Sequence, residues 1–434
     1  MTASKIVGFP SFWRRWEVLP WLFIGFAPVL FALATWGDLN PADNLRLVGV
    51  PLSFLELGFL GLAVHAGWRP VRQFMALSPV VRLLLVAIVV IAFGTAAFRA
   101  PSPIGSFVWT YLSLIHLLFG FGTAWAVADA DGQIRGIIWP TVVCGCFLYA
   151  AMVGAFALSP HRADFDWQFF GLAVSNVRQI GFYMVVGTLA AIGCGVNSRP
   201  RWAILFAGAA TIMMVVSFWT GSRGALVAAL AAIAAGYIVF PRMRTFHAIL
   251  SALIPIFLGA LLSIPLPRPV GVFGIGRMVD SIHASSPDEF SAFRLRMWEG
   301  AWHAFLRRPG FGYGEGQFGI VVPQPQGAYL HPHNVVLQSL IQWGLAGTTL
   351  TLGLVLVATA RLRKVLHGGQ AGVLPAFLVL IGLIVFSFYD GALFHTYPVM
   401  MFSFALAFIL GSDQSSGAVG EPYLSDQALE THNP

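Results

Sequence analysis

Long apolar runs separated by short polar segments dominate the sequence. A helix that crosses a membrane needs about 20 mostly apolar residues, and about twelve segments meet this requirement along the chain. They are residues 19–37, 48–67, 79–97, 108–128, 137–158, 178–196, 202–219, 224–240, 246–264, 334–358, 372–389 and 396–411. The pattern predicts an all-α polytopic membrane protein of about 12 transmembrane helices, with one large loop between the ninth and the tenth.

The composition excludes an ordinary soluble domain. Of the 434 residues, 57% are hydrophobic and 10% are charged, whereas about 25% of the residues in a typical soluble domain are charged. Cys144, Cys146 and Cys194 all fall inside apolar runs, so they predict neither a disulfide framework nor a metal site. The expected surroundings are a lipid bilayer, and the sequence contains no Walker motif.

The distribution of basic residues predicts how the spans are oriented. With a cytoplasmic N-terminus, fourteen Lys and Arg residues fall on the cytoplasmic side and five fall in the short outer loops. This excess follows the positive-inside rule, and an even number of spans returns the C-terminus to the same side. We expect nine spans within residues 1–264, a periplasmic loop at 265–332, three spans within 333–411 and a disordered cytoplasmic tail at 412–434.

The long outer loop is predicted to contain a helix. Apolar side chains recur at helical spacing over residues 288–305, and the glycine-rich residues 309–314 then break the pattern. This arrangement predicts a helix that lies against the membrane, followed by a turn that leads back to His333 at the start of the tenth span.

Charged and polar side chains gather at the predicted outer ends of the spans. Charged groups that lie at a membrane are usually functional. These positions hold Arg178, Ser222, Arg223, Arg294, Arg296, His333, Asn334 and Asp390. Arginine can bind phosphate oxygens through two N–H groups at once, and helix N-termini add positive dipoles. The set therefore predicts a site for a membrane-embedded phosphate ester.

Several of these residues also have a simpler structural interpretation. Arg178 and Arg223 could anchor helix ends at lipid phosphates, and Asp390 could serve only to form a turn. The sequence does not separate Arg294 from Arg296, because both lie in an outer loop where arginine is common.

His333 is the candidate general base, because imidazole titrates near neutral pH. It lies in the segment His331-Pro332-His333-Asn334. Two neighbouring histidines could suggest a metal site, but no further ligands cluster near them in the sequence, so no metal is predicted.

Four motifs resemble those of the O-antigen ligase branch of the O-antigen ligase/polymerase superfamily. The most specific is His333-Asn334, nine residues, then Gly344-x-x-Gly347-Thr348 at the end of the long loop. The others are Ser222-Arg223-Gly224, Arg294-Leu295-Arg296-Met297-Trp298 and Pro309-Gly310-Phe311-Gly312-Tyr313-Gly314. The resemblance covers most of the chain, and it also implies a GT-C-like arrangement of twelve spans around a large periplasmic loop.

The resemblance implies a glycosyltransferase of the bacterial inner membrane whose active site faces the periplasm. Its donor would be O-antigen polysaccharide on undecaprenyl pyrophosphate, and its acceptor would be a sugar hydroxyl of lipid A–core. Neither a cofactor, a metal nor a nucleic acid is expected, and a single displacement would invert the anomeric carbon. Two alternatives remain open, an O-antigen polymerase and a transporter or flippase for lipid-linked glycans.

The expected site contains one set of catalytic residues and one set of residues that bind the substrate. His333 would act as the base, while Arg223 and Arg294 would stabilise the charge that develops on the pyrophosphate. Substrate binding is expected from the remaining candidates, which are Arg178, Arg296, Asn334, Ser222 and Asp390.

Overall fold

The computed structural model describes most of the chain, and all of its regular elements are helices. The described residues are 12–34, 41–159, 167, 174, 176–268, 272, 274–277, 283, 286–287, 291, 294–323, 330–366 and 372–417. No β-strand occurs among them. Much of the predicted loop and most of the predicted tail therefore lie outside the described residues.

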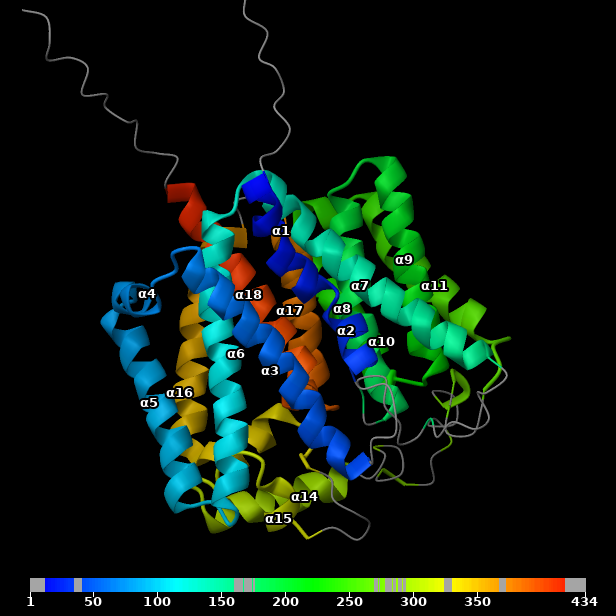
Figure 1. Ribbon diagram of the computed structural model, residues 1–434. Helices are drawn as coiled ribbons and strands as arrows, with labels where there is room; N and C mark the ends of the chain where they lie inside the picture. The colour runs from blue at the N-terminus through cyan, green and yellow to red at the C-terminus, as the bar shows by residue number, and fades with distance from the viewer. Residues whose placement is uncertain are drawn as a thin grey trace, which may run out of the picture.

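The helices form one bundle, shown in Figure 1. The first half contains α1 (Phe12–Gly25), α2 (Ala27–Ala34), α3 (Pro41–His65), α4 (Pro70–Ala76), α5 (Pro79–Phe98), α6 (Pro103–Asp129), α7 (Gly132–Leu158), η2 (Val177–Gln179) and α8 (Ile180–Val196). The second half contains α9 (Pro200–Trp219), α10 (Arg223–Val239), η3 (Pro241–Arg244), α11 (Phe246–Ser263), α14 (Arg294–Arg307), α15 (Phe318–Val321), α16 (Val335–Leu366), α17 (Val373–Ser387), η5 (Ala392–Phe394) and α18 (Thr396–Gly417).

The chain is an all-α polytopic membrane protein. Among the described residues, seven helices are long and apolar enough to cross a membrane, and four shorter apolar helices accompany them. All of these coincide with predicted spans. The first predicted span, 19–37, overlaps two helices that are interrupted at Phe26. Pro28 lies in the first turn of α2, where its missing N–H is tolerated, and this favours a new helix start at that point.

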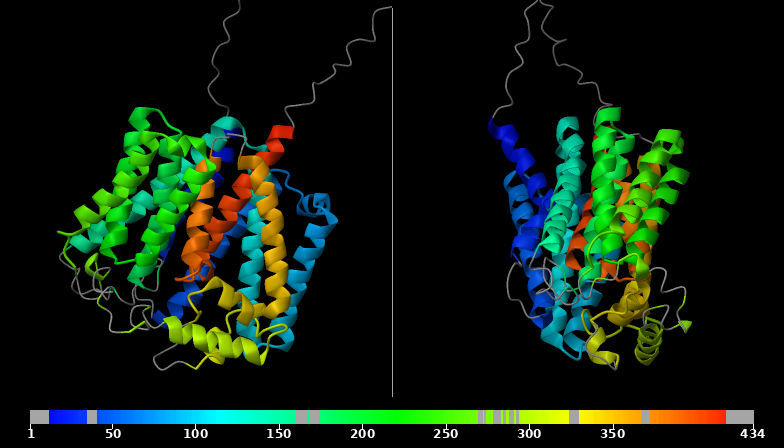
Figure 2. Two further views of the ribbon diagram at one scale, coloured as in Figure 1. Left: turned by 180° about the vertical axis from the view of Figure 1, so that it is seen from behind. Right: turned by 90° about the vertical axis from the view of Figure 1, so that its right-hand side faces the viewer.

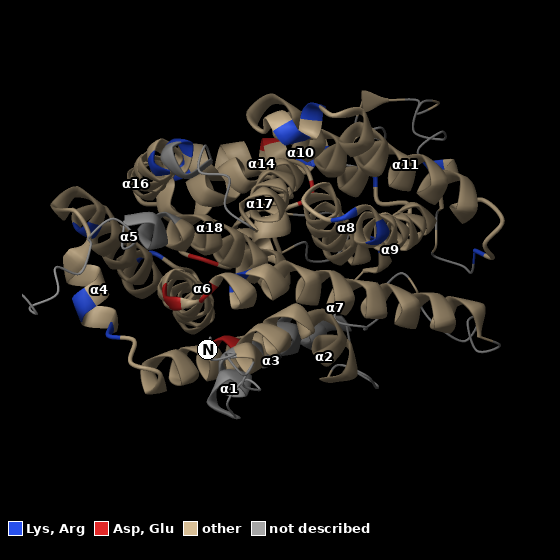
Figure 3. Ribbon diagram, turned by 90° about the horizontal axis from the view of Figure 1, so that it is seen from above, with Lys and Arg blue, Asp and Glu red and all other residues tan. Residues whose placement is uncertain are grey.

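The two ends of the described chain lie at the same end of the bundle. We call the end where α1 begins and α18 finishes the terminal face, and the opposite end, which carries α14 and α15, the loop face (Figure 1). The two further views in Figure 2 show the same separation. Seen from the terminal face in Figure 3, basic residues are distributed around its rim, including one on the short helix α4.

α8 is the central helix of the bundle. Within its span, Val177–Val196, 89% of the residues in the 18-residue apolar window are buried inside the protein. The helix itself has no charged residue and is apolar on all sides, which is the pattern of a helix surrounded by other helices. It packs against α7, α9, α10 and α17. Because α8 follows Arg178 directly, this rigid packing fixes the position of one candidate site residue.

The last helix extends beyond its predicted end. The prediction placed the end of the span at residue 411 and a disordered tail after it, but α18 continues to Gly417. Ser412 explains the difference, because its side chain is buried and its hydroxyl donates to the carbonyl of Phe408, one turn earlier. A polar residue can therefore continue the helix here. Residues 418–434 lie outside the described residues.

The tenth predicted span, 334–358, contains a break. α16 runs from Val335 to Leu366, but Gly344 inside it has φ 63° and ψ −164°. At this break the backbone bonds to the glycine-rich loop 309–314. The N–H groups of Tyr313 and Gly314 donate to Ile341 and Gln342, while those of Leu345 and Ala346 donate to Pro309 and Gly310, all at 2.7–3.0 Å.

The break therefore has a structural purpose. A helix interruption inside a membrane protein exposes backbone polar groups, and these must be paired within the protein. The loop 309–314 supplies the partners, and α14 thereby packs beside the first part of α16. The Gly344-x-x-Gly347 motif thus marks where the loop is attached to the spans, a role that the apolar pattern alone did not predict.

Substitution of Gly344 tests this attachment. A Cβ at Gly344 would lie against the backbone of Gly310, and the residue has positive φ. We expect Gly344→Ala to destabilise the protein by about 1–3 kcal/mol, measured as a lower Tm in detergent. The control is Gly353→Ala in the same helix, whose added Cβ would meet only the Leu84 methyl groups at 3.6 Å. Equal Tm values for the two variants would contradict the account.

Candidate functional site

Asn334 joins the start of α16 to the end of α17. Its side-chain oxygen accepts hydrogen bonds from the backbone N–H groups of Val336 and Leu337, at 3.0 and 3.1 Å, so it caps the helix. Its amide nitrogen donates to the carbonyl of Phe388 at 3.0 Å. Asn334 is therefore fully used in holding two helices together, and it fixes the backbone that presents the preceding residue, His333.

His333 has an unusual backbone conformation. Its φ is 53°, and it is the one non-glycine residue with positive φ in the described part of the chain. Such a conformation costs energy and is found most often where a side chain must point in a particular direction. Trp298 of α14 supports this turn, because its indole N–H donates to the carbonyl of Pro332 at 2.9 Å.

The imidazole of His333 faces Asp390. Its Nδ1 lies 3.5 Å from Oδ1 of Asp390 and 3.4 Å from the carbonyl oxygen of the same residue. Asp390 also accepts a hydrogen bond from Arg294 at 2.8 Å. One carboxylate thus contacts both the candidate base and a candidate cation, and these residues lie far apart in the sequence.

The charge of Asp390 is maintained by its neighbours. Burial alone would raise the pKa of this carboxyl, but the positive charge of Arg294, followed by His333 and Arg178, lowers the pKa well below its usual range. Asp390 is therefore ionised at neutral pH and can orient the imidazole.

Two further histidines surround His333 and are neutral. Burial lowers the pKa of His331 well below its usual range, and that of His395 to about 3, with His333 adding to both effects. The hydrogen bond of His331 is consistent with a neutral ring, because its Nδ1 accepts from the backbone N–H of His333 at 3.2 Å. The ring of His331 also stacks on Phe394, with ring centroids 4.4 Å apart. Both residues therefore form the wall of the site.

The start of α10 brings Arg223 to the same place. Gly221 has φ 71° and forms the tight turn before the helix, and Ser222 is buried against Gly181 of α8. Gly224 packs beneath the Phe386 ring, with Asp390 close by. The N-terminus of α10, with Arg223 as its first residue, therefore points into the site and adds a positive dipole.

Four arginines share this site. They are Arg178, Arg223, Arg277 and Arg294, and each is partly buried. The charge of Arg223 interacts with those of Arg294, Asp390 and Arg178. Burial lowers the pKa of Arg277 to about 9, and the charges of Arg178, Arg223 and Arg294 contribute to the same shift.

Such an arrangement is unfavourable without an anion. Like charges that are partly removed from water repel one another, and in the described residues Asp390 is the carboxylate that offsets them. Guanidinium groups beside a helix N-terminus are the chemical groups that suit an anion with several phosphate oxygens.

The structure separates the two arginines that the sequence could not. Arg294 is partly buried and paired with Asp390, whereas Arg296 is exposed on the same helix. The structure also adds Arg277, which the motifs in the sequence do not single out. No motif surrounds Arg277, so its position could be found only from the fold.

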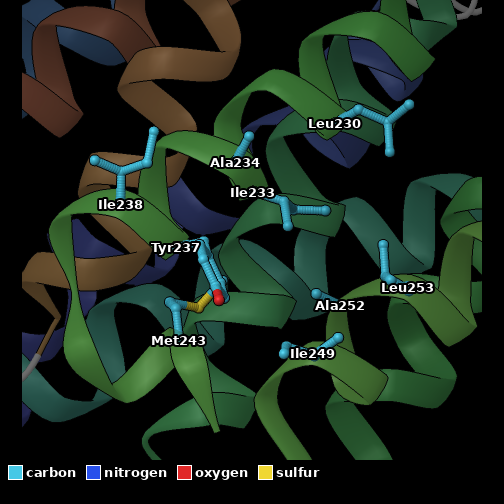
Figure 4. A pocket seen from close by; sticks show the side chains of 9 residues that line it. All are labelled: Leu230, Ile233, Ala234, Tyr237, Ile238, Met243, Ile249, Ala252 and Leu253. Carbon is cyan, nitrogen blue, oxygen red and sulfur yellow. The ribbon is translucent and has the colours of Figure 1, made fainter. Parts of the chain in front are cut away.

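No alternative chemical site emerges from the described residues. They contain no group of three His, Cys, Asp or Glu side chains placed to hold a metal ion. An apolar groove of about 440 Å³ lies between α10 and α11 and is shown in Figure 4. Its lining is apolar except for Tyr237, so it offers no group for catalysis.

Comparison with known proteins gives a family match for part of the chain. Residues 208–352 match a family model described as O-antigen ligase. No curated protein matches the chain. The matched segment is about a third of the chain and extends from α9 to the middle of α16, so it includes Arg223, Arg277, Arg294 and His333.

Substitution of Arg277 tests the anion site. Removing one of four like charges relieves repulsion, so Arg277→Gln should keep or raise the Tm of the protein without ligand. A bound anion stabilises the folded protein in proportion to its affinity, so the rise in Tm on adding inorganic pyrophosphate should fall by about half or more. The control is Arg268→Gln, an exposed arginine of the same segment. A pyrophosphate response equal in both variants would contradict the site.

Proposed function

We propose, on the basis that residues 208–352 match a family model described as O-antigen ligase, that this protein is an O-antigen ligase. It transfers O-antigen polysaccharide from undecaprenyl pyrophosphate to a sugar hydroxyl of lipid A–core. The observation that carries the proposal is the meeting of His333, Asp390 and Arg294 beside three further arginines. This set provides a base, an orienting carboxylate and a pyrophosphate site in one place.

The arginines act on the leaving group. As the bond between the anomeric carbon and the pyrophosphate oxygen breaks, negative charge increases on the pyrophosphate. Fixed positive groups lower the energy of that transition state because they need no reorganisation. Arg223, Arg277 and Arg294 are assigned to the pyrophosphate, with Arg178 as support. These arginines supply the positive charge that stabilises the leaving group. The proposed reaction is therefore metal-independent.

His333 acts on the acceptor. With its Nδ1–H directed at Asp390, the neutral imidazole carries its lone pair on Nε2. This nitrogen takes the proton of the acceptor hydroxyl while the oxygen attacks the anomeric carbon, and undecaprenyl pyrophosphate leaves with the bonding electrons. The resulting imidazolium is stabilised by Asp390, as a buried carboxylate stabilises the histidine of a catalytic triad.

A single displacement with inversion is the stereochemistry that this geometry favours. A double displacement needs a second carboxylate to form the glycosyl–enzyme intermediate. Asp390 is engaged by Arg294 at 2.8 Å and faces His333, so it is assigned to orientation instead of nucleophilic attack. The acceptor oxygen therefore attacks from the face opposite the pyrophosphate.

The remaining candidate residues receive supporting roles. Asn334 holds the backbone of His333 through its contacts to α16 and Phe388. Ser222 is buried against α8 and sets the start of α10. Arg296, exposed on α14, is assigned to the acceptor side, where it can meet anionic groups of lipid A–core.

The proposed location is the bacterial inner membrane, with the loop face in the periplasm. The candidate site lies at the loop face, opposite the ends of the described chain. In the orientation predicted from the sequence, fourteen Lys and Arg residues fall on the side of the chain ends, which the positive-inside rule assigns to the cytoplasm. Lipid-linked donor and acceptor would both reach the site from the outer leaflet.

Substitution of His333 tests the base assignment. We expect His333→Ala to lower kcat for transfer from undecaprenyl-pyrophosphate-linked O-antigen to lipid A–core by about 100- to 10,000-fold. The control is His303→Ala, an exposed histidine on α14 that is 3.9 Å from Glu299. Wild-type enzyme should keep its activity in EDTA. Normal turnover by His333→Ala would refute the base, and inhibition by EDTA would refute metal independence.

The lipopolysaccharide of a deletion strain distinguishes a ligase from its relatives. A ligase deletion should remove all O-antigen from lipid A–core, whereas loss of a polymerase leaves a single unit attached. The gel profile after complementation with wild type and with His333→Ala provides the measurement. A strain that retains one unit would favour the polymerase. Full complementation by His333→Ala would favour a transporter, because transport needs no base.

A further inference from the structure

Glu315 is a buried acid that the proposed reaction does not use. It lies in the loop between α14 and α15, and it is 4% exposed. Its Oε2 accepts a hydrogen bond of 2.5 Å from the hydroxyl of Ser113 on α6. The side chains of Trp343 and Thr110 also face this carboxyl. Burial raises the pKa of Glu315 to about 7, against the opposing effect of Ser113.

The polar side chains next to Glu315 belong to a longer series of polar residues inside the bundle. Thr110, Ser113 and His116 are spaced by three residues and lie on one face of α6. The Nδ1 atom of His116 lies 2.7 Å from Oε1 of Glu56 on α3, and both side chains are buried. Polar groups inside a membrane are unfavourable unless they are paired, and they are usually functional. A series of such groups that ends at Glu315 therefore indicates a function for this residue.

The loop around Glu315 connects two parts of the fold. On one side, the backbone N–H of Ser102, just before α6, donates to the side chain of Gln317 at 2.9 Å. On the other side, the N–H of Gly314 donates to the carbonyl of Gln342 at the break in α16. Trp343, the residue before Gly344, lies near enough to Glu315 to oppose the rise in the pKa of its carboxyl. Glu315 thus lies where α6, the loop and the break of α16 meet.

The first part of α16 depends on this junction. It is the short segment between the cap at Asn334 and the break at Gly344. One end of the segment presents His333, and the other end is held by the loop that Glu315 fastens to α6. Movement at the break would therefore displace the imidazole with respect to Asp390, although Glu315 touches neither.

We propose that Glu315, held by Ser113 above the His116–Glu56 pair, is a positioning residue that sets the orientation of His333 through the broken helix α16. Of the four arginines assigned to the donor, Arg294 is the one on α14, the helix that the loop 309–314 joins to α16. The other three lie on η2, α10 and the segment before α14, so Glu315 acts mainly on the placement of the base. The catalytic consequence rests on the proposed function.

The experiment compares Glu315→Ala with Glu315→Gln in the full-length protein in nanodiscs. We expect Glu315→Ala to lower kcat by about 10- to 100-fold, because a small misplacement of a catalytic group has this effect, while KM for the donor stays within about twofold. Glu315→Gln keeps an oxygen that accepts from Ser113 and should restore most of kcat. The control is Glu299→Ala, an acid on α14 whose side chain is 72% exposed.

Hydrogen exchange provides a readout that is independent of activity. In Glu315→Ala, the backbone N–H groups of Tyr313, Gly314, Leu345 and Ala346 should exchange faster, because they form the bonds at the break. Those of the central helix α8 should keep their wild-type rates. Faster exchange throughout the protein, or an unchanged rate at the break, would overturn the proposal.

The two readouts separate the possible failures. If wild type shows no transfer while the exchange at the break responds to Glu315→Ala, the proposed function fails and the structural link stands. If kcat falls equally in the Ala and Gln variants with a large rise in donor KM, Glu315 affects donor binding and the positioning role is refuted.

Discussion

The carboxylate of Asp390 is the contact on which the whole site depends. It pairs with Arg294 of α14, faces the imidazole of His333, and lies beside Gly224 near the start of α10. These elements come from distant parts of the sequence, and no single helix could place all of them. In the described residues it is also the carboxylate whose charge acts on the partly buried arginines Arg223 and Arg277.

Backbone pairing at the break of α16 gives this contact its rigidity. The glycine-rich loop 309–314 satisfies the polar groups that Gly344 exposes, and α14 is thereby held beside the first part of α16. Glu315 fastens the same loop to α6. The base is placed by α16, whereas three of the four arginines lie on other elements. We therefore expect a change at Glu315 to affect turnover more than donor binding.

The sequence was sufficient for the spans and insufficient for the connections between them. Apolar runs predicted the helices because burial in lipid depends on local composition. The break at Gly344 lies inside such a run, and its cause is a loop some thirty residues earlier in the chain. Arg294 and Arg296 have identical chemistry, and only the position of Asp390 distinguishes them. Arg277 has no motif of its own and enters the site through the fold.

A structure of the protein in nanodiscs with undecaprenyl pyrophosphate bound would test the central claim most directly. The account predicts that the pyrophosphate contacts the guanidinium groups of Arg223, Arg277 and Arg294, with the first sugar position adjacent to Nε2 of His333. A pyrophosphate bound away from these arginines, or separated from His333 by the wall of His331 and His395, would contradict it.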